Sequence, residues 1–336
     1  MRRLRTLGAA VSSVPITLFG LVLVTFLIGR VMPIDPVIAI VGDHAQNDVV
    51  QAVRDQLGLD RPLVVQFWIY LKLLAHGDLG RSVLTSNPVT QDIAQYFPAT
   101  IELATVAILL AVLVGIPLGV LAAVRRGTWI DHCVRVFCLA GHSIPIFLLA
   151  LIALLVFYAT LGWAPGTGRS DIGLEGMVPE ITGFLTVDAL IAGDWTSFRD
   201  AVAHLVLPAG VLAYFSMAYI ARMTRAFMLD ALQGEFVITA RAKGLSAARV
   251  IWRHAFGNIA VRLVTVLALT YAGLLEGAVV TETVFGWPGL GQYLTISLLN
   301  ADMNAVLGAT LVIGLSYLLL NLLADAAYGL LDPRVR

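Results

Sequence analysis

The chain contains six long apolar stretches separated by polar segments. Five of them carry no Asp, Glu, Lys or Arg and cover residues 9–29, 103–124, 136–158, 201–221 and 304–324. Each reaches the roughly 20 residues that a helix needs to cross a hydrocarbon core. The sixth stretch, residues 263–281, is interrupted by Glu276. The pattern therefore predicts six membrane-spanning helices.

Composition agrees with an integral membrane protein. Of the 336 residues, 59% are hydrophobic and 13% are charged, and the mean hydropathy is +0.86. A soluble domain of this length carries roughly a quarter charged residues. The predicted fold class is therefore all-α and integral membrane. The net charge of zero averages two unlike faces and says nothing about partners.

The distribution of basic residues predicts the orientation of the spans. If the N-terminus is cytoplasmic, 15 of the 22 Lys and Arg fall in the cytoplasmic segments 1–8, 125–135, 222–262 and 325–336. Multi-pass membrane proteins carry such an excess on their cytoplasmic side. We therefore expect both termini in the cytoplasm. The first stretch is too long for a signal peptide and lacks a cleavage pattern, so we expect an uncleaved anchor.

The polar segments divide the chain into two predicted regions. Residues 1–95 comprise the first span and a long outer segment, in which 47–57 and 63–74 have the spacing and aromatic composition of amphipathic helices. Residues 96–336 comprise the other five spans. The outer segment 160–200 is rich in Gly, Pro and acidic residues, so we expect it to be irregular and exposed.

Segment 222–262 is the most basic part of the chain, with seven Lys and Arg. A run of small residues from Glu235 ends at a glycine, which predicts a short helix, a turn and a second helix from Ser246. A basic elbow at the cytoplasmic face suits docking of a soluble partner, although by itself it could also contact anionic lipid of the bilayer. The residues expected at the contact are Thr239, Ala240, Arg241, Ala242, Lys243, Gly244, Leu245 and Ser246.

The sequence offers no complete catalytic constellation. An ATP-binding loop ends in Lys, but Lys72 follows an aromatic-rich segment and Lys243 lacks the glycine five residues upstream. No two of the six histidines lie three or four residues apart, so no helix-borne metal site is expected. The segment from Gly141 to Ser143 resembles an intramembrane serine protease only faintly. We expect no catalytic residue, no metal and no cofactor bound by this chain.

Polar residues inside the apolar stretches are candidates for a translocation pathway, because charges in a hydrocarbon core are costly. Glu276 has two open roles: meeting a cationic group of a solute, or forming an interhelical hydrogen bond. His142 in the third stretch and Asn321 in the last are the other pathway candidates.

The basic elbow also resembles a known family. Residues 239–246, followed by Arg253, His254 and Asn258, are similar to the cytoplasmic coupling motif of permease subunits of ABC importers of the dipeptide/oligopeptide type. Arg262 departs from the pattern, since relatives commonly have a proline shortly after the asparagine. The resemblance covers nearly the whole chain, in segments 77–82, 98–103, 115–123, 141–145, 204–208, 282–291 and 321–336.

The resemblance implies a type I permease fold with a coupling helix, in the bacterial cytoplasmic membrane. Ala240, Ala242 and Gly244 would permit close docking, while Arg241 and Lys243 would orient the loop. The implied partners are a second permease, two ATP-binding subunits that hold ATP and Mg, and an extracytoplasmic substrate-binding protein, with no nucleic acid. Peptides are the implied solute, and nickel chelates, glutathione or a sugar-like solute are the alternatives for what is transported. A membrane-embedded hydrolase and an ion channel are the competing classes.

Overall fold

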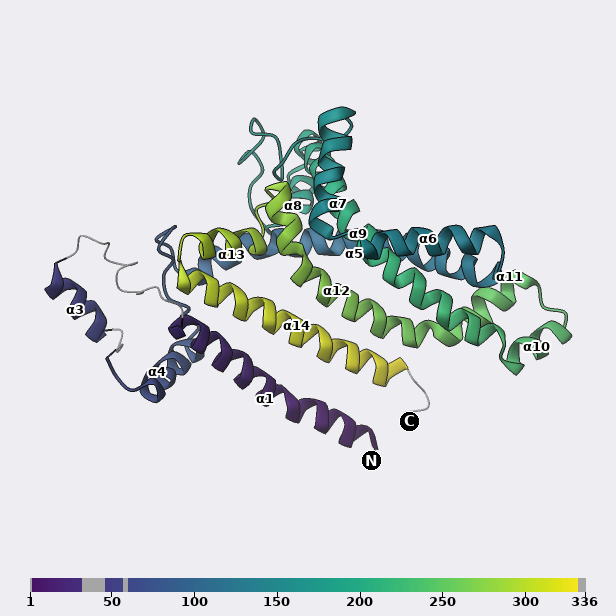
Figure 1. Cartoon of the computed structure of the whole chain (residues 1–336), viewed down its shortest axis with the longest axis horizontal. Coiled ribbons are helices and arrows are strands. Elements are labelled where there is room, and N and C mark those ends of the chain that lie inside the picture. The colour runs from purple at the N-terminus through teal and green to yellow at the C-terminus, as the bar shows by residue number, and fades with distance from the viewer. Residues whose placement is uncertain (1, 32–45, 57–59, 332–336) are drawn as a thin grey trace.

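The computed structural model describes residues 2–31, 46–56 and 60–331. Its long helices run roughly side by side in an elongated bundle (Figure 1). In chain order the helices are α1 (Arg2–Val31), α3 (Asn47–Gln56), α4 (Leu63–Ala75), α5 (Val89–Val124), α6 (Trp129–Ser143), α7 (Ile146–Ala153), α8 (Leu185–Ala192), α9 (Trp195–Leu232), α10 (Glu235–Ala242), α11 (Ala247–Arg249), α12 (Gly257–Phe285), α13 (Leu290–Leu299) and α14 (Met303–Leu331). Two π-helical segments extend α7 and join α11 to α12, at Leu154–Thr160 and Val250–Phe256.

The most extensive helix packing is between α5 and α9. Along α5, buried small residues recur every four positions, at Ala107, Ala111, Gly115 and Gly119. Small residues at this spacing let helix backbones approach closely in membrane proteins. At Gly119, an added Cβ would lie only 2.6 Å from the carbonyl oxygen of Ala221 in α9. This stripe of small residues therefore sets how closely α5 and α9 can approach each other.

Large apolar side chains complete one core between α5, α9 and α12. Leu103 of α5, Leu212 of α9 and Leu274 of α12 are each at most 3% exposed. Trp287, which follows α12, is 1% exposed and joins the same cluster. Burial of such side chains is the main source of packing energy in this part of the bundle.

Five of the six predicted spans are single helices, namely parts of α1, α5, α9, α12 and α14. Among the described residues, four helices are long and apolar enough to cross a membrane, and a bent pair raises the number to five. The apolar part of α1, Val14–Gly29, is shorter. The chain is therefore an all-helical, multi-pass membrane protein over the part that the structure describes.

The third predicted span is a bent pair of helices rather than a single helix. It consists of α6 and the helix Ile146–Thr160, which meet at 102°. Pro145 precedes the second helix, and Ile144 has an extended backbone with ψ of 124°. Proline has no N–H for the helical ladder and disfavours a helical residue before it. The local sequence therefore breaks a stretch whose hydropathy alone predicts continuity.

The N-terminal region packs on α14. Leu21 and Leu307 fill the crossing between α1 and α14, where added Cβ atoms at Gly314 and Gly29 would each lie 2.7 Å from a leucine methyl. The predicted amphipathic helices are confirmed as α3 and α4, although residue 57 lies outside the described residues. The Phe67 ring of α4 lies 5.1 Å from that of Phe26 in α1, so α4 covers α1 rather than only facing a membrane surface.

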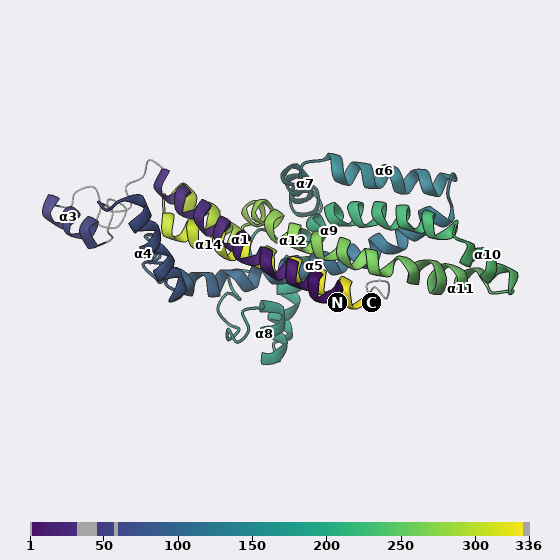
Figure 2. The same cartoon turned by 90° about the horizontal axis from the view of Figure 1, so that it is seen from below.

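The two ends of the bundle differ. One end, here the elbow end, carries α10 and α11 (Figures 1 and 2). The region called the loop end comprises α13 together with α8 and the irregular segment 161–184, and α8 projects from the side of the bundle (Figure 2). α1 begins and α14 finishes toward the elbow end (Figure 1). The predicted division at residue 95 falls inside α5 and stays a prediction. Residues 332–336, part of the last family-like segment, lie outside the described residues.

Candidate functional sites

α10 finishes in a tight turn made by a glycine. Leu245 N donates to Ala240 O at 3.2 Å, and Gly244 N donates to Arg241 O at 2.9 Å. These two bonds form a Schellman motif, which requires a left-handed residue after the helix. Gly244 provides it with a φ of +75°. The predicted order of short helix, glycine turn and second helix is confirmed.

The elbow, defined as residues 235–250, has a small core of its own. Val237, Ala240 and Val250 are 1%, 5% and 1% exposed, and Leu245 packs against them. This cluster fixes α10 against the helix that follows. Ala240 therefore points inward, and its small size suits the elbow core. Its part in close docking of a partner stays a prediction.

The rest of the predicted contact segment lies on the surface. Ile238 is 66% exposed and Phe236 is 37% exposed, and Leu245 is half-buried. Apolar side chains at a surface beside Arg are typical of protein–protein contacts. The exposed residues of the segment are Thr239, Arg241, Ala242, Lys243, Gly244 and Ser246.

An ion pair braces the helices at the elbow end. Arg225 of α9 donates from Nε and NH2 to the two carboxylate oxygens of Asp131 in α6, at 2.7 and 2.9 Å. Gly127 N donates to the same carboxylate at 3.0 Å. A bidentate pair fixes orientation as well as distance. A force applied near the elbow would therefore be shared between α9 and α6.

A cavity of about 550 Å³ lies between the α6–α7 break, α9 and α12. Its lining is mostly apolar, with polar groups from His142, Ser216, Tyr219 and Thr270. A second cavity of about 360 Å³ shares His142 and Tyr219 and continues along α6 and α9. His142 therefore stands where the two cavities meet. Concave, mostly apolar sites with a few polar groups are typical of small-molecule binding.

The other two pathway candidates are placed differently. Glu276 is exposed on α12, between Gly273 and Gly277, which line the larger cavity. Asn321 is half-buried on α14, and no described lining residue of that cavity comes from α14. Neither Glu276 nor Asn321 is among the described lining residues of the cavity, although Glu276 lies on a helix that lines it and Asn321 does not.

At the loop end, the carboxylate of Glu282 joins three helices. It accepts hydrogen bonds from Thr100 Oγ1 of α5 at 2.6 Å, and from Gly291 N and Gln292 N of α13 at 2.7 and 3.0 Å. Thr100 Oγ1 in turn accepts from Leu290 N at 2.8 Å. Glu282 is 0% exposed. Two of the family-like segments, 98–103 and 282–291, therefore meet at one buried charge.

Two further buried carboxylates fasten the segment before α5. Asp302 accepts from Ser82 Oγ at 2.5 Å. Asp92 accepts from Thr85 Oγ1 at 2.5 Å and from Tyr293 OH at 3.1 Å. The segment is thereby attached both to α13 and to the beginning of α14. A third family-like segment, 77–82, belongs to this same network.

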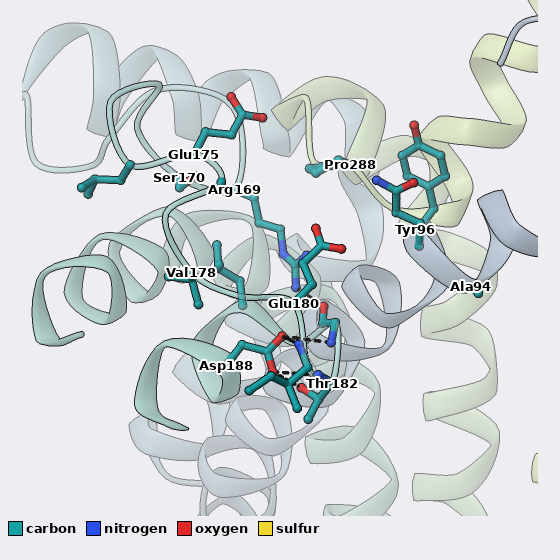
Figure 3. A pocket seen from close by; sticks show the side chains of 16 residues that line it. Ala94, Tyr96, Arg169, Ser170, Glu175, Val178, Glu180, Thr182, Asp188 and Pro288 are labelled. Atoms are coloured by element: carbon teal, nitrogen blue, oxygen red, sulfur yellow. Dashed lines mark hydrogen bonds between the residues drawn. The ribbon is translucent and has the colours of Figure 1, made fainter. Parts of the chain in front are cut away.

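The irregular segment 161–184 is anchored on α5. Arg169 donates to Glu102 Oε2 at 2.5 Å and to Gly183 O at 2.7 Å. A cavity of about 480 Å³ lies between this segment and α5, and Figure 3 shows its side chains. Several of them are charged or polar, including Tyr96, Glu175 and Glu180. This cavity is far more polar in character than the one at His142.

Asp188 organises the same segment from the first turn of α8. Its carboxylate accepts from Thr182 N and Oγ1 at 2.8 and 2.6 Å, from Gly183 N at 3.0 Å and from Ile181 N at 3.2 Å; the bonds to Thr182 are drawn in Figure 3. Burial by itself raises the pKa of this carboxyl, but these hydrogen bonds outweigh it and hold the pKa below the ordinary 3.8. The charged form is thus favoured.

Sequence reasoning assigned no site role to these buried carboxylates. A local signal existed for Asp302, which precedes the last apolar stretch and accepts from Ala305 N at 3.3 Å as a helix cap. An Asp just before an apolar run is a helix-start signal. Thr100, which donates to Glu282, and Arg169, which donates to Glu102, come from segments distant in the chain, so no local signal identifies these pairs.

Together these features define a class: a helical membrane protein with an exposed elbow at one end, buried carboxylates at the other and an apolar cavity between. The family model "Binding-protein-dependent transport system inner membrane component" matches residues 115–336. The model of the corresponding N-terminal part, "Binding-prot-dependent transport system membrane comp, N-term", matches residues 3–104. The chain belongs to this family of transport permeases.

Curated relatives agree over nearly their full length. The probable D,D-dipeptide transport system permease protein DdpB of Escherichia coli K12 is 43% identical over 94% of this chain and 93% of its own. The di/tripeptide transport system permease protein DppB of Pseudomonas aeruginosa UCBPP-PA14 is 43% identical over 95% of each chain. The dipeptide transport system permease protein DppB of Escherichia coli K12 is 40% identical over 99% of this chain and 98% of its own.

Among solved structures, one titled as inward-facing conformations of the MetNI methionine ABC transporter is 18% identical, with a TM-score of 0.49 over 70% of this chain and 93% of that chain. The family assignment rests on the family models and the curated relatives. All three of those relatives are named as permeases.

Proposed function

We propose that this chain forms, with a second permease, the pathway of an ATP-driven importer for di- and oligopeptides. The printed names of the relatives, which are permeases for dipeptides, D,D-dipeptides and di/tripeptides, support this solute class. The chain itself is non-catalytic, and ATP and Mg are held by two separate ATP-binding subunits. It has the type I permease fold with six spans, and both termini lie in the cytoplasm.

The elbow carries this proposal. It offers an exposed contact face, with Ile238, Arg241 and Lys243, on a turn held by its own buried core. α9 leads into this turn, and a helix continuing into α12 leads out of it. A displacement of the elbow by an ATP-binding subunit would therefore act on both helices at once. These same helices line the cavity at His142.

The apolar cavity is the proposed part of the pathway on this chain. His142 lies where its two parts meet. Glu276 is exposed on α12 between the lining residues Gly273 and Gly277, and its carboxylate would meet the ammonium group of a peptide. Asn321 lies on α14, which contributes no described lining residue. The substrate-binding protein docks at the loop end, opposite the elbow.

The docking proposal is tested with a photo-crosslinking amino acid in the assembled transporter in native membranes. At Ile238, 66% exposed on the elbow, it should capture an ATP-binding subunit. At Leu299, 80% exposed at the loop end, it should not. Equal capture at both positions, or none at Ile238, would overturn the assignment of the elbow.

The solute class is tested by uptake in cells that lack other peptide importers. Labelled dipeptide uptake should depend on this chain and disappear in Gly244→Glu, whereas Glu175→Gln, on the loop, should retain it. Nickel chelates and glutathione are the competing solutes in the same assay. Uptake of either, without dipeptide uptake, would keep the importer and reject the peptide assignment. Uptake that persists without nucleotide would favour a channel.

A further inference from the structure

Three potential metal ligands converge at the loop end. His204 and Asp200 lie one turn apart on α9, and Asp171 belongs to the irregular segment. One ligand atom from each lies within 4.8 Å of the others. The backbone of the irregular segment is fixed at this point, because Asp171 N donates to Asp200 Oδ2 at 2.9 Å. A search for paired histidines in the sequence misses this cluster, since it has one imidazole and two carboxylates.

The hydrogen bonding of His204 leaves one ring nitrogen aimed at a carboxylate. Nδ1 lies 3.0 Å from the carbonyl oxygen of Asp200 and 3.2 Å from its carboxylate Oδ1. Both oxygens only accept, so Nδ1 carries the hydrogen, and in the neutral ring Nε2 presents a lone pair. Nε2 faces Asp171 Oδ1 at 3.7 Å, outside hydrogen-bond distance, and the His204 side chain is 2% exposed. The buried Nε2 thus faces an electron-rich oxygen of an exposed carboxylate, and a cation between these two atoms would stabilise them.

The donor set favours a transition-metal ion of the Zn²⁺ class. Imidazole nitrogen with carboxylates suits Zn²⁺, whereas Mg²⁺ and Ca²⁺ prefer all-oxygen sites. An ion about 2.1 Å from Nε2 and from Asp171 Oδ1 would subtend roughly 125°, which a shift of about 0.3 Å brings to the tetrahedral value. Metal-binding histidines usually donate their other nitrogen to a carbonyl or carboxylate, as Nδ1 of His204 does here.

We propose that His204 Nε2 and Asp171 bind one divalent ion of the Zn²⁺ class, which clips the irregular segment to α9. The carboxylate of Asp200 holds the two ligands in place, because it lies 3.2 Å from His204 Nδ1 and accepts from Asp171 N. The Asp171 side chain is 72% exposed, so the ion has an entry route and room for a water ligand. Two residues earlier in the segment, Arg169 binds Glu102 of α5. The ion adds a second anchor beside this one and ties the segment to a different helix. This inference does not depend on which solute the transporter carries.

The test uses the full chain in lipid nanodiscs, purified without a polyhistidine tag. Calorimetric titration with Zn²⁺ should give one equivalent, and Co²⁺ should give a visible absorption band typical of nitrogen–oxygen coordination. Asp171→Asn should weaken Zn²⁺ binding by roughly 10-fold or more, as loss of one of the two side-chain ligands implies. Because Asp171 is exposed, this variant should fold even where His204→Gln does not. Glu175→Gln and His76→Gln are matched controls that should keep wild-type affinity.

A second readout follows the segment itself. Zn²⁺ should slow protease cleavage between residues 161 and 184 in the wild-type chain and in both controls, but not in Asp171→Asn. Absence of saturable binding would overturn the proposal and leave a protonated His204 paired with Asp171. Binding that Asp171→Asn leaves unchanged would overturn it equally, because the metal would then sit elsewhere.

Discussion

The close approach of α5 and α9 predicts that one added methyl group at Gly119 destabilises the chain. An alanine Cβ there would lie 2.6 Å from Ala221 O and 2.6 Å from Thr224 Cβ, whereas ordinary contact begins at 3.4 Å. Each neighbour would have to retreat by about 0.8 Å. One of these atoms belongs to the backbone and the other is bonded to it, so no side-chain rotation relieves the overlap. The helices themselves would have to separate.

The expected magnitude follows from two opposing effects. Extra methyl groups in a packed core cost about 1–3 kcal/mol, and a backbone clash belongs to the upper part of that range. Alanine regains roughly 1 kcal/mol over glycine through helix propensity. Gly119→Ala should therefore lose about 2 kcal/mol of unfolding free energy. Gly210→Ala on α9, where an added Cβ meets nothing within 4 Å, should instead gain about 0.5–1 kcal/mol.

The assay is equilibrium unfolding of the purified chain in mixed micelles by titration with SDS, followed by far-ultraviolet circular dichroism. The two variants carry the same chemical change in the same helix pair, so propensity and lipid contacts largely cancel between them. Gly119→Ala should unfold at a lower SDS fraction than the wild type, and Gly210→Ala at an equal or higher one. If Gly119→Ala proved as stable as Gly210→Ala, the close-packing account of the stripe would be refuted.

Three further predictions concern other parts of the chain. Gly244→Ala should weaken capture of the ATP-binding subunits, because a φ of +75° costs about 1–2 kcal/mol for alanine, while Gly244→Asn should retain more; equal loss in both would refute the turn argument. Glu282→Gln should lower the unfolding free energy by about 2–3 kcal/mol, because it disrupts a buried acceptor of three hydrogen bonds. Glu276 is exposed on the same helix, so the control Glu276→Gln should change the unfolding free energy by less than about 0.5 kcal/mol. The lowered pKa of Asp188 means that its contribution to loop stability is present above the ordinary 3.8 and is lost as pH falls below it. Cleavage of the segment by an acid-active protease should therefore rise steeply in that window, and Asp188→Asn should remove the steep rise.

Local patterns predicted most of the secondary structure. The elbow is the clearest case, because a short helix finished by Gly244 depends only on residues within one turn of each other. The same holds for α3 and α4, whose spacing and composition identified them. The bend in the third predicted span has a local cause as well. Hydropathy averages over residues 136–158, while the break depends on one proline, Pro145.

The candidate sites show the same difference between features with a local sequence signal and features that depend on packing. His142 and the elbow residues were predicted because each stands out in its own segment. For Ala240, the sequence gives the size of the side chain but not its direction, which the packing of Val237 and Val250 decides. The carboxylate of Glu282 meets a hydroxyl 182 residues away in the chain, and no sequence spacing encodes that meeting.

By itself, the sequence determined the apolar helices, the elbow and the family resemblance, because hydropathy, helix-ending turns and motif order are properties of contiguous residues. Only the tertiary structure decided which buried charges find partners. Glu282 with Thr100, Arg169 with Glu102 and His204 with Asp171 are each brought together by packing of separate segments. A buried charge must be satisfied wherever the fold brings a partner, and that place depends on how the helices pack rather than on any stretch of the chain.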